Sequence, residues 1–311
     1  MFDLFTHTAR PAPELLFTRD DPSDPRLGEL VRTDSASYGQ ARAVILACPQ
    51  DEGVRRNRGR PGAAEGPAEI RRAFYRLTPL GLDATSLFDL GDTIIQPTLE
   101  ETHEIHREIV SEVLRSGKQV IVLGGGNDIS YPDCAAAAAQ FLHPLIFNID
   151  AHFDVRDDDT RNSGTPYRQL LDEGVILPEN FFEMAYQPAS NSPIYHDYLV
   201  EKGVVCISLR ELRNRGFVST FKEILGRKRS EAIFWGFDLD AVRTSDAPGV
   251  SAPNPTGMSG AELCELARLA GATRETRIVE FTEVNPRLDI DDRTSRLVAV
   301  AIHSFLEGVA E

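Results

Sequence analysis

Short runs of apolar and β-branched residues recur along the chain, and turn residues or helical patterns follow each run. The runs show little alternation between apolar and polar positions, which is typical of strands covered on both faces in a parallel sheet. The pattern predicts eight strands: Ala43–Cys48, Leu87–Leu90, Gln119–Leu123, Leu145–Ile149, Phe182–Ala185, Val204–Ser208, Ala232–Phe237 and Arg277–Phe281.

Amphipathic helical patterns lie between the predicted strands. The longest covers Leu99–Arg115, where apolar residues recur every three or four positions. Pro97–Thr98 supplies a start signal for this helix and Gly117 a stop signal. Two further patterns of this kind cover Gly257–Leu269 and Arg293–Leu306.

The alternation of strand and helix predicts a single α/β domain over residues 1–311. Its sheet is expected to be doubly wound and mostly parallel, with eight strands and with helices on both faces. The first 30 or so residues contain several prolines, and we expect them to form an irregular surface arm. His103 and His106 have no further ligand near them in sequence, so we expect them on the solvated face of their helix.

Composition and charge narrow the classes of function. The chain has 311 residues and a net charge of −15, which disfavours binding to nucleic acid or to a membrane surface. No apolar run reaches the roughly 20 residues of a membrane helix, and the N-terminus lacks the pattern of a secretory signal. The four cysteines are scattered without a CxxC spacing, which is typical of buried thiols in a reducing cytosol. We therefore predict a cytoplasmic protein that acts on a small molecule.

Polar side chains gather directly after two of the predicted strands. Asp150, His152 and Asp154 follow one strand at alternate positions, and Asp238 and Asp240 follow another. Ligands of open α/β sheets bind beyond the carboxyl ends of the strands, so these five groups are expected to meet at one edge. Each cluster alone could be a set of solvated acids. Together their repulsion favours a cation such as Mn²⁺, Zn²⁺ or Fe²⁺.

Two more strand ends carry candidate groups. A glycine run, 124–126, precedes Asn127 and Asp128, and its spacing does not match a phosphate-binding loop. It favours a tight turn that directs Asn127 or Asp128 into the same edge. Glu283 lies just beyond the last strand, where it is either a surface acid or a carboxylate that holds a cationic amidine or guanidine.

Four segments, GGGND, DAHFD, FDLDAV and EFTEVNP, resemble the landmarks of the ureohydrolase superfamily, which includes arginase, agmatinase and formimidoylglutamase. The resemblance covers about residues 40–305 and implies an arginase-like three-layer α/β/α fold. Residues 51–71, Val155–Arg156 and 163–167 most resemble formimidoylglutamases. This subgroup implies hydrolysis of N-formimidoyl-L-glutamate to L-glutamate and formamide, a step of histidine degradation.

The resemblance also implies a site for two Mn²⁺ ions per subunit. Asp150 and Asp238 match the bridging carboxylates, His152 and Asp240 match further ligands of one ion, and Asp154 matches a ligand of the other. The family usually has histidine at the position of Asn127. An amide oxygen is a weaker ligand than imidazole, so one ion is expected to bind weakly or not at all.

The resemblance and the chemistry of the substrate assign further roles. An anionic substrate needs a local cation, and Arg156 is expected to bind it, unless Arg156 pairs with the acids at 157–159. Asn57 and Tyr167 are expected to contact substrate, Glu283 to position the amidinium and Asp154 to assist proton transfer. Family members suggest a homo-oligomer, a trimer or a hexamer.

Two alternatives remain open at the level of the sequence. One is an enzyme with the same fold and an altered, single-metal site that acts on a guanidino compound or a side-chain amide. The other is a non-catalytic binding protein that keeps the fold.

Overall fold

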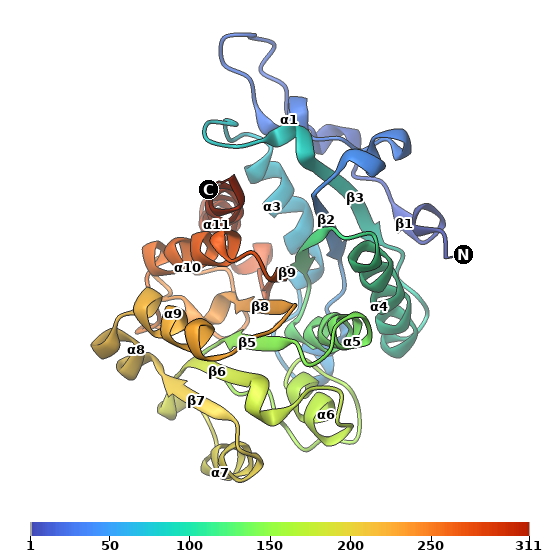
Figure 1. Ribbon diagram of the computed structural model, residues 1–311. Helices are drawn as coiled ribbons and strands as arrows, with labels where there is room; N and C mark the ends of the chain where they lie inside the picture. Colours follow the sequence, from blue (N-terminus) through green and yellow to red (C-terminus); the bar gives the residue numbers. More distant parts are fainter. Residues whose placement is uncertain (1, 311) are drawn as a thin grey trace.

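The computed structural model describes residues 2–310 (Figure 1). Positions 1 and 311 of the predicted domain lie outside the described residues. Within this range nine strands form one sheet: β1 (Thr8–Ala9), β2 (Ala43–Cys48), β3 (Leu87–Thr93), β4 (Gln119–Gly124), β5 (Leu145–Ile149), β6 (Phe181–Tyr186), β7 (Val205–Ser208), β8 (Ile233–Asp238) and β9 (Thr276–Thr282).

The sheet is parallel except at one edge. The strands lie in the order β1-β3-β2-β4-β9-β8-β5-β6-β7, and β1 alone pairs antiparallel to its neighbour. All eight strands predicted from the apolar runs are present, and their ends shift by three residues at most. The mostly parallel sheet is therefore confirmed, with one more strand than predicted.

The additional strand, β1, comes from the segment that we expected to be an irregular arm. It pairs with the far end of β3, which continues past Leu90 to Thr93. Gly91 makes this possible, because its φ is +95° and a Cβ there would collide with the carbonyl oxygen of Ala9. The acidic and glycine residues that close β3 resemble a turn in the sequence, and this hid the pairing.

Helices cover both faces of the sheet (Figure 1). Helices α4, α5 and α6 lie on one face, whereas α3, α9, α10 and α11 lie on the other. The helices are α1 (Leu27–Leu30), α2 (Glu52–Arg56), α3 (Gly66–Phe74), α4 (Leu99–Arg115), α5 (Ser130–Gln140), α6 (Pro166–Asp172), α7 (Pro193–Lys202), α8 (Leu209–Arg215), α9 (Phe217–Arg227), α10 (Gly260–Ala272) and α11 (Arg293–Ala310). Among residues 2–310, none of them is long and apolar enough to cross a membrane.

Helix α4 has the predicted bounds, but its buried face differs from the prediction. Thr98 and Glu101 form a capping box at its start. His103 and His106 are only 1% and 0% exposed, so the expectation of a solvated face was wrong. His106 Nδ1 lies 2.7 Å from the hydroxyl of Thr93, so the ring is packed between α4 and the sheet rather than solvated.

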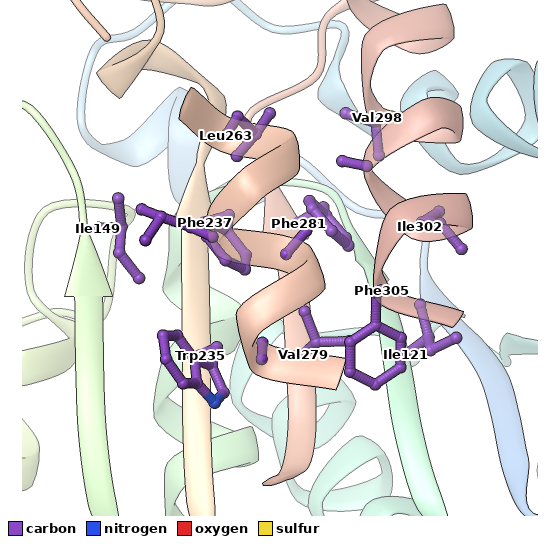
Figure 2. Packing of buried hydrophobic residues seen from close by; sticks show 14 of the residues in the cluster. Ile121, Ile149, Trp235, Phe237, Leu263, Val279, Phe281, Val298, Ile302 and Phe305 are labelled. Carbon is purple, nitrogen blue, oxygen red and sulfur yellow. The ribbon is translucent and has the colours of Figure 1, made fainter. Parts of the chain in front are cut away.

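Each strand of the central sheet contributes alternate side chains to two apolar cores. Ile45 faces the core under α10 and α11, and Leu46 faces the core under α4 and α5. Figure 2 shows the first of these cores, where Phe237 of β8 and Phe281 of β9 stack with ring centroids 5.3 Å apart. This packing fixes the ends of β8 and β9, where candidate ligands follow.

Helices α10 and α11 approach each other closely at two glycines. A Cβ at Gly271 would collide with the carbonyl oxygen of Phe305, and one at Gly308 would collide with the carbonyl oxygen of Arg268. Both obstacles are backbone atoms, so neither can move aside without separating the helices.

Gly271→Ala is therefore expected to lower the free energy of unfolding by about 1–3 kcal/mol, because the added methyl overpacks the helix contact. Gly226→Ala is the matched control. Gly226 lies near the end of α9, and a Cβ there meets nothing within 4 Å. The control should raise stability by up to about 1 kcal/mol through helix propensity. Urea unfolding measures both, and equal effects of the two substitutions would contradict the close-contact explanation.

Candidate metal centre

The candidate ligands lie at the carboxyl ends of four adjacent strands. β4, β9, β8 and β5 are neighbours in the sheet, and they lead into Asn127, Glu283, Asp238 and Asp150 respectively. Parallel strands bring their carboxyl ends to a single edge, which places four segments distant in sequence around one point.

Five side chains form two overlapping groups of metal donors. Asp150, His152 and Asp240 form one group, and Asp150, Asp154 and Asp238 form the other. Within each group the donor atoms lie within 4.8 Å of one another. His152 Nδ1 is 3.0 Å from Asp240 and 3.5 Å from Asp150. Two groups that share one carboxylate fit a pair of divalent cations bound to oxygen and nitrogen donors.

The electrostatics of the carboxylates also fit a cation. Burial, together with the neighbouring Asp240, raises the pKa of Asp150 to about 7. Burial, together with Asp150, raises the pKa of Asp154 to about 7. The pKa values of Asp238 and Glu283 are raised well above the usual range by burial and by Asp240. So many buried acids at one point cost free energy unless positive charge offsets their repulsion.

Local backbone geometry directs two of these acids. Asp154 has φ +47° and Glu283 has φ +64°, a left-handed conformation that non-glycine residues seldom adopt. The N–H of Glu283 donates to the carbonyl of Gly125 at 2.9 Å. The N–H of Asn127 donates to Glu283 Oε1 at 3.1 Å. The glycine loop and the end of β9 therefore hold each other in place.

Asn127 presents its amide nitrogen to the acids. Its Nδ2 donates to Asp154 at 2.6 Å and lies 3.4 Å from Asp150. Its Oδ1 accepts from the hydroxyls of Ser130 and Thr282 at 3.0 and 3.1 Å. The predicted ligation through Oδ1 would need the amide to turn over, so in this structure Asn127 is a hydrogen-bond donor.

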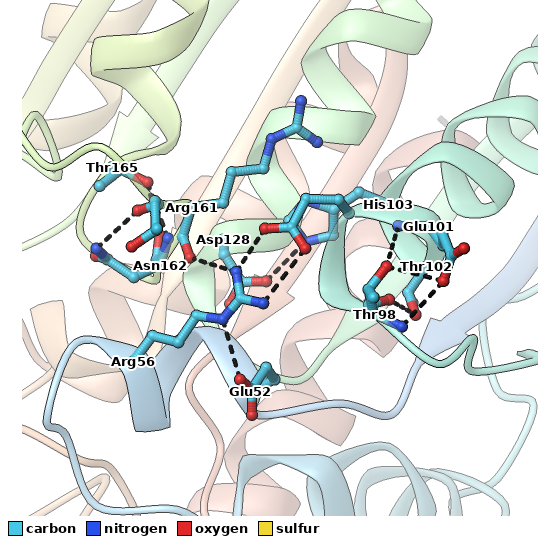
Figure 3. A network of polar contacts seen from close by, with 12 residues as sticks. Glu52, Arg56, Thr98, Glu101, Thr102, His103, Asp128, Arg161, Asn162 and Thr165 are labelled. Atoms are coloured by element: carbon cyan, nitrogen blue, oxygen red, sulfur yellow. Dashed lines mark hydrogen bonds and ion pairs between the residues drawn. The ribbon is translucent and has the colours of Figure 1, made fainter.

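Asp128 points behind the glycine loop, away from the metal donors. Its Oδ2 accepts from Gln50 at 2.6 Å and lies 2.7 Å from Nε2 of His103 (Figure 3). A Cβ at Gly53 would collide with the same carboxylate. Among the described residues, Asp128 thus belongs to neither group of metal donors. Of the adjacent pair Asn127 and Asp128, only Asn127 contacts a donor carboxylate, that of Asp154.

A cavity of about 360 Å³ opens over the metal donors. Asn57 and Arg156 line it, as predicted for substrate contacts, and Asn57 donates to Ser163 at 3.0 Å. Six further residues that line the cavity were not among the predicted site residues: Arg58, Gly59, Arg60, Ser163, Ser251 and Ala252. The arginine-rich run before residue 61 was a signal in the sequence for Arg58 and Arg60.

Tyr167 is the one predicted site residue that the structure places elsewhere. It is fully buried in the core beneath α4 and α5, with its ring stacked on Phe181 at 4.8 Å. It does not line the cavity, so the expected contact with substrate is corrected to a packing role. Helix α6 begins at Pro166 and turns the next side chain under the sheet.

The alternative role of Arg156, a salt bridge with the acids that follow it, is not observed. Asp157 pairs with Arg168 at 3.3 Å, and Asp158 accepts from Asn162 at 2.9 Å. Among residues 2–310, Arg156 has no ion pair. Its guanidinium is therefore available at the cavity.

A parallel sheet with paired acid clusters at its carboxyl edge is the arrangement that the resemblance to the ureohydrolase superfamily implies. A profile of the arginase family matches residues 41–307, and the chain belongs to this family. It is 33% identical over 272 residues to the formimidoylglutamase of Staphylococcus carnosus, and the match covers 86% of each chain.

Solved structures agree with this placement. A Trypanosoma cruzi formiminoglutamase solved with Mn²⁺ superposes with a TM-score of 0.86 at 35% identity, over 92% of this chain and 99% of that one. The formimidoylglutamase of Bacillus subtilis gives a TM-score of 0.86 at 28% identity, over 94% of each chain. The resemblance to the ureohydrolase superfamily is thus confirmed, with formimidoylglutamases among its similar members.

The raised pKa values predict how metal affects stability. Carboxyl groups of an unfolded chain titrate near pH 4. In the folded protein the pKa values of Asp150 and Asp154 are about 7. The unfolded chain therefore loses these protons first, and the free energy of unfolding falls as pH rises from about 4 to about 7. Mn²⁺ competes with protons for these oxygens, so its stabilising effect should grow over the same range.

Thermal unfolding with chelator and with excess Mn²⁺ tests this at about pH 5.5 and about pH 8. The rise in Tm caused by Mn²⁺ should be clearly larger at the higher pH. Asp154→Asn should reduce that difference, because the amide carries no titrating proton. Equal shifts at both pH values in the unsubstituted protein would show that the carboxylates are ionised throughout.

Proposed function

We propose that this protein is a formimidoylglutamase, which hydrolyses N-formimidoyl-L-glutamate to L-glutamate and formamide. The observation that carries the proposal is the polarity of the cavity. Asp238 and Glu283 are buried and, with Asp154, form what we call the floor, whereas Arg156 is exposed and, with Asn57, forms what we call the wall. The substrate has a cationic amidine at one end, one carboxylate on the carbon that bears the amidine nitrogen and a second at the end of the side chain, so it needs both kinds of lining. Membership of the arginase family and the formimidoylglutamase relatives support it.

We propose that the cofactor is Mn²⁺, held by the two donor groups that share Asp150. When bound, the ions would act as Lewis acids that make water a nucleophile at neutral pH. The Trypanosoma cruzi relative was solved with Mn²⁺, which supports this choice of metal. Whether one or two ions bind depends on Asn127, the position where the family usually carries histidine.

Each residue around the donors has a separate task. Glu283 accepts hydrogen bonds from the amidinium and offsets its charge, because its backbone fixes the carboxylate over the cavity. Asp154 lies on the same floor and assists proton transfer to the departing nitrogen. Arg156 binds a carboxylate of the substrate at the cavity wall, and Asn57 helps to orient the substrate there. A doubly cationic guanidine such as agmatine would be repelled by Arg156.

Assays on the Mn²⁺-loaded protein test the proposed reaction. N-formimidoyl-L-glutamate should yield L-glutamate and formamide in equal amounts, whereas arginine and agmatine should yield little urea. Glu283→Gln should lower kcat by more than about tenfold, since one interaction with the cationic centre is lost, and should keep the metal content. Preferential release of urea would overturn the proposed substrate. No hydrolysis of any amidine or guanidine would favour a binding protein that keeps the fold.

The number of ions is tested separately with Asn127→His. Imidazole binds first-row divalent metals better than a neutral amide, so the variant should approach two Mn²⁺ per subunit. Metal analysis after gel filtration measures this, with the unsubstituted protein as control. A control that already holds two tightly bound ions would sink the idea of a weakened second site. If the variant gains an ion without gaining activity, the reaction uses a single metal.

Three further expectations stay predictions. They are a cytoplasmic location, a role in histidine degradation and assembly into a homo-oligomer, either a trimer or a hexamer. The negative charge of −15 is consistent with a small-molecule enzyme rather than one that binds nucleic acid or membrane. Light scattering of the purified protein measures the oligomeric state directly.

A further inference from the structure

A second arginine shares the cavity with Arg156. Arg58 follows α2 and lines the cavity above the metal donors. It also lines an adjoining cavity of about 550 Å³, which opens beside the first. Arg58, Arg156 and Asn57 are the three residues that line both cavities. Two guanidinium groups therefore lie at the boundary between the metal-donor cavity and the space next to it.

The neighbouring arginines are already engaged. Arg55 pairs with Glu52 at 2.5 Å, and Arg56 pairs with both Glu52 and Glu100. The pair of Arg56 with Glu52 is drawn in Figure 3. Arg60 donates to two backbone carbonyls, those of residues 250 and 251. Within residues 2–310, the guanidinium of Arg58 has neither an ion pair nor a hydrogen bond, and the same is true of Arg156. In a chain of net charge −15, two such cations at one cavity point to an anionic ligand.

The backbone that carries Arg58 is fixed in an unfavourable conformation. Arg58 has φ +60°, which costs free energy for a residue with a Cβ. Its N–H donates to Arg55 O at 3.0 Å, and the N–H of Gly59 donates to Val54 O at 2.9 Å. The N–H of Arg60 donates to the hydroxyl of Ser251 at 2.8 Å. The loop is thus held on both sides of Arg58, and asparagine or glycine would suit this φ better.

We propose that Arg58 binds one carboxylate of the substrate while Arg156 binds the other, so that the pair selects amidines with two carboxylates. The inference rests on the proposed function and adds a residue that sets its specificity. A planar guanidinium binds a carboxylate through two parallel hydrogen bonds, and one arginine cannot do this for two separated carboxylates at once. The second carboxylate of a dicarboxylic substrate therefore needs a second arginine.

Three substrates separate the two arginines. N-formimidoyl-L-glutamate has both carboxylates, N-formimidoyl-4-aminobutyrate lacks the α-carboxylate, and N-formimidoyl-2-aminobutyrate lacks the side-chain carboxylate. Arg58→Asn suits the left-handed backbone and removes the charge. It should raise KM for the dicarboxylate by about 10- to 100-fold, with little change in kcat. It should affect only one of the two monocarboxylates, and Arg156→Ala should affect the other. Arg55→Gln is the control, because it removes the same positive charge three residues away and outside both cavities. It should leave KM unchanged.

Calorimetry with the product L-glutamate gives a readout without turnover. The Mn²⁺-loaded protein should bind L-glutamate more tightly than 4-aminobutyrate. Whichever of Arg58→Asn and Arg156→Ala removes the partner of the α-carboxylate should abolish most of that difference, and the other variant should weaken both ligands alike. Equal binding of the two, an unchanged KM in Arg58→Asn, or an equal loss on all three substrates would overturn the proposal. Failure of the proposed function looks different: the unsubstituted protein would not hydrolyse N-formimidoyl-L-glutamate, whatever its affinity for L-glutamate.

Discussion

The repulsion between buried carboxylates is the constraint on which the rest of the structure depends. Asp150, Asp154, Asp238 and Glu283 come from three strand ends and meet within one small volume. The sheet can hold them there because two apolar cores fix the strands on both faces, and the glycine loop is tied to the end of β9. The free energy of that packing offsets the cost of gathering like charges, and a bound cation removes much of the remainder.

The same constraint explains the division of the cavity. The floor concentrates negative charge for metal and amidinium, so cations for the carboxylates of a substrate must stand apart from it at the wall. In the proposed function, Arg58 in the loop after α2 and Arg156 after β5 provide them, and the strained backbone at Arg58 is held by the hydrogen bond of the next N–H to Ser251. The lining of the cavity thus combines one segment from the first quarter of the chain with several strand ends from the rest.

Much of this arrangement could be predicted from the sequence. Continuous apolar runs located eight strands, and the acids directly after them located the edge where the candidate metal donors gather, because both signals are local. What the sequence could not reveal depends on contacts between distant segments. β1 needs Gly91 to approach Ala9, and the two histidines of α4 are buried beside polar partners from other segments, Asp128 for His103 and Thr93 for His106. The orientation of Asn127 is set by two hydroxyls, one of them more than 150 residues away, and Tyr167 is turned inward by the start of α6.

The strand order has a consequence for how the chain is made. β9, the last strand in sequence, lies in the middle of the sheet between β4 and β8. Until the ribosome has released residues 276–282, β4 lacks one neighbour and keeps an open edge. Such edges pair readily with other chains, so nascent protein passes through an aggregation-prone stage late in synthesis. Truncation just before Arg293 would remove α11 and leave β9 in place, whereas truncation just before Thr276 would also remove the strand that joins the two halves of the sheet.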